Sequence, residues 1–131
     1  MTNYSRLADR PVDRPGGLAD PAPLEGTWVN TYPKTTGIQQ FQIYPAGDQW
    51  LLSVTAKNAP LDWGSVPITA YAATIDDQQC VAFHAIYDFG FMRSFLAANT
   101  NKGLIIIAAY NEFSDDSGRS NYFSREFYYR V

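Results

Sequence analysis

The chain has 131 residues, a net charge of −3 and an aromatic content of 15%. The length fits one domain with one core, and the acidic balance argues against proteins that neutralise nucleic-acid phosphates or anionic membrane surfaces with basic residues. No apolar run approaches the roughly 20 residues of a membrane helix, and residues 1–10 have no signal-peptide core. We therefore expect a cytoplasmic protein with no nucleic-acid or membrane partner.

Residues 1–23 differ in composition from the rest of the chain. They are rich in proline, glycine and charged residues and show no apolar periodicity, a pattern typical of flexible or irregular segments. We interpret residues 1–23 as a flexible N-terminal arm, or a strap across the domain, and residues 24–131 as the folded domain.

From Leu24 onward, short segments of β-branched and aromatic residues alternate with turn residues. The pattern predicts strands over residues 26–32, 38–44, 50–56, 68–75, 80–87, 91–98, 104–113 and 121–131, with a loop over 58–67. The connections are short and none is a long crossover. We therefore predict an all-β fold, an antiparallel up-and-down β-barrel of about eight strands, because closure also removes exposed apolar edges.

Side chains alternate between the two faces of a strand. This alternation places Trp28, Asn30 and Tyr32 on one face of the first strand, and Phe41 on the inward face of the second. In the last strand the more apolar set comprises Phe123, Arg125, Phe127 and Tyr129, which predicts that Arg125 faces inward. Around His84 both faces are apolar, so the alternation leaves the direction of this side chain open.

The opening Gly26-Thr27-Trp28-Val29-Asn30 resembles the start of the first barrel strand in the calycin superfamily, which includes lipocalins and avidins. In lipocalins an arginine from the end of the barrel packs over this tryptophan, and the resemblance implies that Arg125 does so here. A guanidinium can stack on an indole and bond to nearby carbonyls, which would close one end of a barrel. The likeness to avidins implies a ligand contact for Asn30, although no later tryptophan-rich pocket is found.

Motifs for metal or cofactor chemistry are absent from the sequence. The chain has one histidine, His84, and one cysteine, Cys80, which excludes a site of several histidines and an internal disulfide. Residues 88–90 and 114–118 are predicted to be turns, and no nucleotide-binding loop occurs. We expect neither a metal nor a cofactor.

The abundance of tyrosine and tryptophan favours a barrel that binds a small, mostly apolar or aromatic ligand, since an eight-stranded barrel can enclose one small molecule. The candidate ligand-binding residues combine the predicted inward positions with aromatic and polar side chains of the central strands. They are Trp28, Asn30, Tyr32, Phe41, Tyr71, His84, Tyr110 and Arg125.

Two alternatives remain open. The barrel could be a cofactor-independent cyclase or isomerase, with acid–base or electrostatic help from His84, Tyr87, Arg93 or Glu112. It could instead be an interaction protein, such as a homodimer, that uses Tyr122, Tyr128 and Arg130, which the alternation places on the exposed face of the last strand.

Overall fold

The computed structural model describes residues 19–58 and 60–131. One short 3-10 turn, η2, precedes nine strands within these ranges. The elements are η2 (Ala22–Leu24), β1 (Gly26–Asn30), β2 (Ile38–Ala46), β3 (Gln49–Ala56), β4 (Asp62–Pro67), β5 (Thr69–Ala72), β6 (Cys80–Asp88), β7 (Met92–Asn101), β8 (Leu104–Phe113) and β9 (Tyr122–Arg130).

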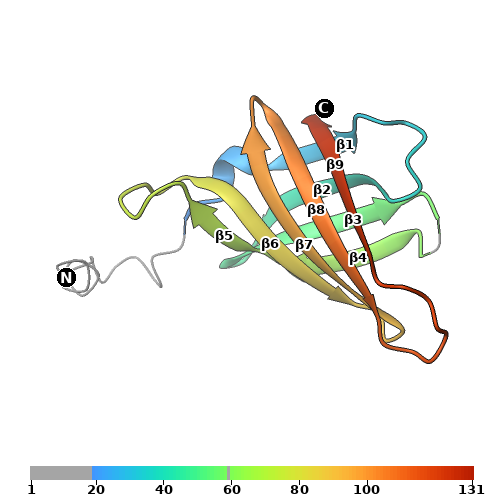
Figure 1. Cartoon of the computed structure of the whole chain (residues 1–131). Coiled ribbons are helices and arrows are strands. Elements are labelled where there is room, and N and C mark those ends of the chain that lie inside the picture. Colours follow the sequence, from blue (N-terminus) through green and yellow to red (C-terminus); the bar gives the residue numbers. More distant parts are fainter. Residues whose placement is uncertain (1–18, 59) are drawn as a thin grey trace.

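The nine strands form one antiparallel sheet in the order β4-β3-β2-β1-β9-β8-β7-β6-β5. The last strand, β9, pairs with both β8 and β1, which joins the two halves of the chain. The two ends of the sheet, β4 and β5, are separated only by Ile68, so one bent segment pairs with β3 on one side and β6 on the other. The sheet therefore curls into a nearly closed barrel (Figure 1), which confirms the predicted fold.

Strand β4 corrects the sequence prediction, which assigned residues 58–67 to a loop. Asp62–Pro67 pairs with β3, and its register shifts opposite Val54 and Thr55. Gly64 has a φ of +76° next to this shift. The half-buried residues are Trp63 and Val66, three positions apart. Because a bulge breaks the two-residue alternation, the usual strand pattern is missing from this segment.

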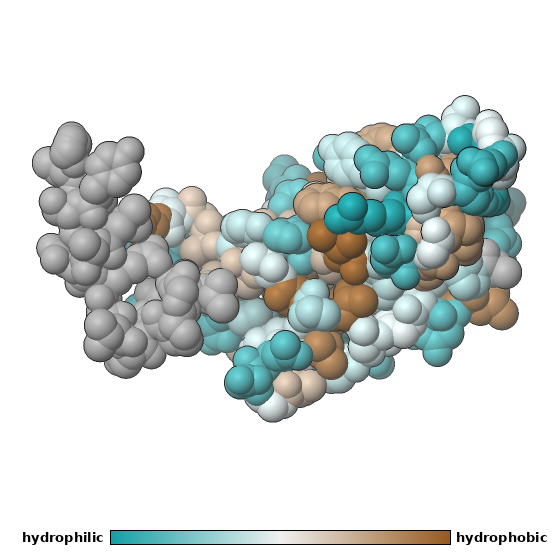
Figure 2. All heavy atoms as spheres, turned by 90° about the horizontal axis from the view of Figure 1, so that it is seen from below, coloured by the Kyte–Doolittle hydropathy of each residue, from teal (hydrophilic) through white to brown (hydrophobic). Residues whose placement is uncertain are grey.

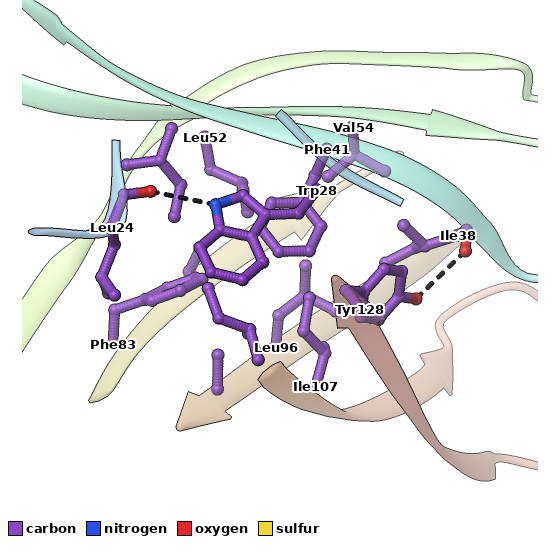
Figure 3. Close-up of a cluster of buried hydrophobic side chains, with 14 of the residues drawn as sticks. Leu24, Trp28, Ile38, Phe41, Leu52, Val54, Phe83, Leu96, Ile107 and Tyr128 are labelled. Atoms are coloured by element: carbon purple, nitrogen blue, oxygen red, sulfur yellow. Dashed lines mark hydrogen bonds between the residues drawn. The ribbon is translucent and has the colours of Figure 1, made fainter. Parts of the chain in front are cut away.

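The core fills the barrel with side chains from the inward faces of the strands. Trp28, Phe41, Leu52 and Val54 are buried as predicted, and Phe83, Leu96, Ile107 and Tyr128 meet them from the opposite wall (Figure 3). Trp28 stacks on Phe41 at a ring-centroid distance of 6.2 Å. Full burial of each large apolar side chain contributes about 1.5–3 kcal/mol.

The last strand faces the other way from the prediction. Tyr128 is 1% exposed, whereas Tyr129 and Arg125 are exposed. The inward set therefore contains Tyr128, Glu126 and, nearer the mouth, Ser124. Counting apolar residues misassigned this strand because the outer surface of the barrel is itself rich in aromatic side chains.

The neighbouring strand β6 resolves the direction of His84. Phe83, Ala85 and Tyr87 are buried, so His84 lies on the outer face. There its Nδ1 lies 2.6 Å from the hydroxyl oxygen of Tyr71, and its ring stacks on Phe95.

The segment before β1 packs against the barrel within the described residues. Ala19 is buried, and Asp20 forms a bridge with Gln79 beside β6. Residues 20–23, assigned to the arm, thus contact the domain, whereas the flexibility predicted for residues 1–18 lies outside the described residues. In the described ranges no helix has the length and apolar character needed to cross a membrane.

Candidate functional site: the open end of the barrel

One end of the barrel is closed by Trp28 and Arg130. The indole N–H of Trp28 donates to the Leu24 carbonyl at 3.0 Å (Figure 3). The Arg130 guanidinium lies 4.6 Å from the centroid of that indole and donates to the carbonyls of Glu25 and Pro23 at 3.1 and 2.7 Å. The indole N–H and two N–H groups of the guanidinium therefore have partners within the protein.

Arg130, and not Arg125, packs over Trp28, which corrects the sequence prediction. Arg125 is exposed, and its guanidinium lies 5.1 Å from the ring centroid of Phe127 on the outer side of β9. The correction follows from the reversed face of this strand. Arg130 shares the register position of Trp28 across the β1–β9 pair.

The other end of the barrel opens into a cavity of about 750 Å³. Its walls come from the loop over residues 31–37 and from the ends of strands β2, β3, β4, β7, β8 and β9. The lining residues are Tyr32, Lys34, Thr35, Thr36, Gly37, Ile38, Ala56, Asn58, Pro60, Trp63, Met92, Ile107, Ala109, Asn111, Tyr122, Ser124, Arg125, Glu126 and Tyr128. The volume lies in the range of sites that hold a small organic molecule.

Ile38 and the ring of Tyr128 lie at the floor of the cavity, and hydrogen bonds fix them in place. The Tyr128 hydroxyl and the Asn30 amide both donate to the Ile38 carbonyl at 3.0 Å. Burial raises the pKa of Tyr128 far above its ordinary value, and the nearby charge of Glu126 adds to this effect. Tyr128 is therefore a neutral donor at physiological pH, and its ring separates the cavity from the core.

A carboxylate lies on one wall of the cavity. Glu126 is half-buried, and the Thr35 hydroxyl lies 2.9 and 2.7 Å from its two oxygens. The Thr35 oxygen also accepts the backbone N–H of Gly37 at 3.0 Å. A hydroxyl has one proton and a carboxylate has about four acceptor positions, so most of the accepting capacity of Glu126 is left for water or a ligand.

A second polar group lies on the neighbouring strands. The Ser94 hydroxyl donates to the Asn111 side-chain oxygen at 2.6 Å, and both residues are buried. The Asn111 amide nitrogen makes a long contact of 3.5 Å with the Tyr122 carbonyl. The amide nitrogen has two N–H donors and, among the described residues, makes this one long contact, so it has donor capacity to spare.

Aromatic side chains border the mouth. Trp63 donates its indole N–H to the Pro60 carbonyl at 3.1 Å and packs edge-on against Tyr87 and Phe89. Tyr32 and Tyr122 line the cavity and are more than half exposed. The mouth therefore offers aromatic surface to a molecule that enters.

The predicted ligand-binding residues fall into three places. Tyr32 and Arg125 line the cavity. Trp28, Asn30 and Phe41 are buried around and below its floor. The remaining three, Tyr71, His84 and Tyr110, lie on the outer face of the sheet.

The four catalytic candidates do not meet at one site. Tyr87 points inward, where its hydroxyl oxygen lies 3.0 and 2.8 Å from the carbonyl oxygens of Leu52 and Gly64, and burial raises its pKa above the ordinary range. Arg93 and Glu112 are register partners that border a separate shallow depression. That depression lies on the outer face, on which His84 also lies.

The outer face carries a row of aromatic rings across β5 to β9. Neighbouring ring centroids are 5.1–6.4 Å apart along the series Tyr71, His84, Phe95, Tyr110 and Phe123. Such cross-strand pairs stabilise a sheet. Figure 2, which views the molecule from below, shows further hydrophobic residues at the surface, near the middle of the molecule in that view.

Sequence reasoning missed three polar residues of the cavity, Glu126, Thr35 and Asn111. Glu126 lies two positions before Tyr128 and therefore shares its face of the strand. This spacing points to the cavity only when Tyr128 is known to face inward. Among the described residues, no group of three or more histidine, cysteine, aspartate or glutamate side chains is arranged to hold a metal ion.

Comparisons of the chain with protein-family models, curated proteins and solved structures found no match.

Proposed function

We propose that this protein is a calycin-like barrel that binds a small, mostly apolar or aromatic molecule in its open end. The observation that carries the proposal is the contrast between a cavity of about 750 Å³ at one end and, at the other, a cap in which Arg130 covers Trp28 and both donate to backbone carbonyls. A barrel closed at one end and hollow at the other is suited to hold a ligand.

The Trp28–Arg130 pair supports the calycin-like assignment. It joins the Gly-x-Trp opening of the first barrel strand to an arginine of the last strand. The mainly apolar floor and the aromatic rim support a ligand with a hydrophobic body. The candidate catalytic residues lie outside the cavity: Tyr87 is bonded within the core, and Arg93 and Glu112 border a depression on the outer face. We therefore do not extend the proposal to catalysis.

Native mass spectrometry of the purified protein, followed by the same measurement after denaturation, tests the proposal. We expect a small molecule that is released only on denaturation. Ala109 lines the cavity and Ala108 faces outward on the same strand, which makes a matched pair. Ala109→Phe should abolish the bound mass, and Ala108→Phe should retain it.

A second measurement covers a ligand lost during purification. The chain has three tryptophans, of which Trp63 lines the cavity and Trp28 lies in the closed end. The protein is labelled with 5-fluorotryptophan, and the ¹⁹F signal of Trp63 is assigned as the one that is missing from the spectrum of Trp63→Phe. Addition of a low-molecular-weight extract of the host cells should shift this signal. A bare native mass combined with an unchanged Trp63 signal would contradict ligand binding.

A further inference from the structure

The carboxylate of Glu126 offers free hydrogen-bond acceptor positions on one wall of the cavity. Among the described residues of the lining, Glu126 is the acidic one, and it lies on the inward face of β9 beside Tyr128. Within residues 19–58 and 60–131 it forms no salt bridge. A half-buried carboxylate with one hydroxyl partner is incompletely compensated.

The part of the lining that the structure describes has two basic residues, which are placed differently from Glu126. Lys34 is exposed on the loop over residues 31–37, and the guanidinium of Arg125 lies over Phe127 on the outer side of β9. Both line the rim. An anionic ligand deep in the cavity would face the carboxylate, whereas a cationic one would be attracted to it.

The remaining surroundings of Glu126 suit the same kind of ligand. Thr35 holds the carboxylate from one side, and a Cβ on Gly37 would lie 3.2 Å from a Glu126 oxygen. The Thr35 hydroxyl thus holds the carboxylate against the loop, at a point where Gly37 has no side chain to displace it. Aromatic faces at the mouth, such as Trp63 and Tyr122, favour cations as well as apolar groups.

We propose that the ligand is an organic cation: an ammonium or amidinium N–H group that Glu126 binds, attached to an apolar or aromatic body that fills the cavity. This inference rests on the proposed ligand-binding function and names the chemical class of the ligand. The cationic group donates to the carboxylate acceptors that Thr35 leaves unused, and the body packs on Ile38, Ile107 and Ala109.

Three probes with the same phenyl body test the charge requirement: 2-phenylethylamine, 2-phenylethanol and 3-phenylpropionate. Their affinities are measured from the ¹⁹F signal of Trp63. We expect the amine to bind about tenfold more tightly than the alcohol, the fold-change of one charge-assisted hydrogen bond, and the carboxylate to bind most weakly.

Two isosteric variants locate the effect. Glu126→Gln keeps an acceptor for Thr35 but removes the charge. It should reduce the preference for the amine to about twofold or less, because only neutral hydrogen bonding then remains. Glu112→Gln, on the outer side of the neighbouring strand, should leave the preference unchanged. Thermal unfolding of each variant confirms that it is folded.

The outcomes separate this inference from the proposed function. Equal binding of the three probes, preference for the carboxylate, or a preference for the amine that survives in Glu126→Gln would overturn the cation proposal. If no probe binds while native mass spectrometry shows a bound molecule that Ala109→Phe removes, the cation proposal falls and ligand binding stands. If no probe binds and both the mass and the extract experiment are negative, both fall.

Discussion

The two ends of this barrel are built from the same strands but use their polar residues differently. At the closed end, the Trp28 indole and the Arg130 guanidinium both donate to backbone carbonyls of the segment before β1. At the open end, Glu126 keeps acceptor positions that the Thr35 hydroxyl does not fill. Matched polar groups stabilise a fold, whereas unmatched ones leave interaction energy for a ligand. Substitutions at the closed end should therefore lower stability, and those at the open end should change binding.

The largest expected effect is that of Trp28→Ala. The side chain is 2% exposed, stacks on Phe41 and lies under the guanidinium of Arg130. Its removal therefore leaves a cavity in the core. We expect a loss of about 3–5 kcal/mol in the free energy of unfolding, measured by urea denaturation. Trp63→Ala, at the half-buried rim, is the matched comparison and should cost clearly less. Equal losses would refute the distinction between the two ends.

The next effect concerns the buried tyrosines at alkaline pH. Burial raises the pKa of both Tyr87 and Tyr128 above the ordinary value of about 10. Because the folded state holds these protons more tightly, their contribution to stability is complete below pH 10 and is lost as the pH rises further. Tyr128→Phe and Tyr87→Phe should each flatten the fall in unfolding free energy above pH 10, measured by chemical denaturation at several pH values. A slope that neither substitution alters would contradict this account.

A smaller effect separates the two arginines of β9. Arg130→Ala removes the stacking on Trp28 and two hydrogen bonds to carbonyls, and we expect a loss of about 1–2 kcal/mol. Arg125→Ala removes an exposed contact with Phe127 and should cost about 0.5 kcal/mol. Urea denaturation of both variants gives the comparison. A larger loss for Arg125→Ala would restore the role first predicted for that residue.

The smallest effect is expected for His84→Ala. The imidazole lies on the outer face between Tyr71 and Phe95, away from the cavity, so the unfolding free energy should change by less than about 1 kcal/mol. The response of the Trp63 ¹⁹F signal to ligand should be the same as in the unsubstituted protein. A lost response would place His84 in the ligand site after all.

Sequence reasoning was most successful where one face of a strand is clearly polar. Gln40 and Gln42 alternate with Phe41 and Ile43 in β2, and the structure buries the apolar pair. It failed in β9, where Phe123, Phe127 and Tyr129 on one face outweigh Tyr128 on the other. It also failed at β4, where the bulge near Gly64 removes the alternation.

By itself the sequence determined an all-β, up-and-down barrel, because short alternating segments joined by tight turns allow few other arrangements. It also determined the inward faces of the first three strands. Tertiary structure alone decided which arginine caps Trp28, which way His84 points and that Glu126 faces the cavity. The physical reason is that strand alternation defines two faces but not which one is inside. Where both faces are aromatic, the curvature and closure of the sheet select the interior.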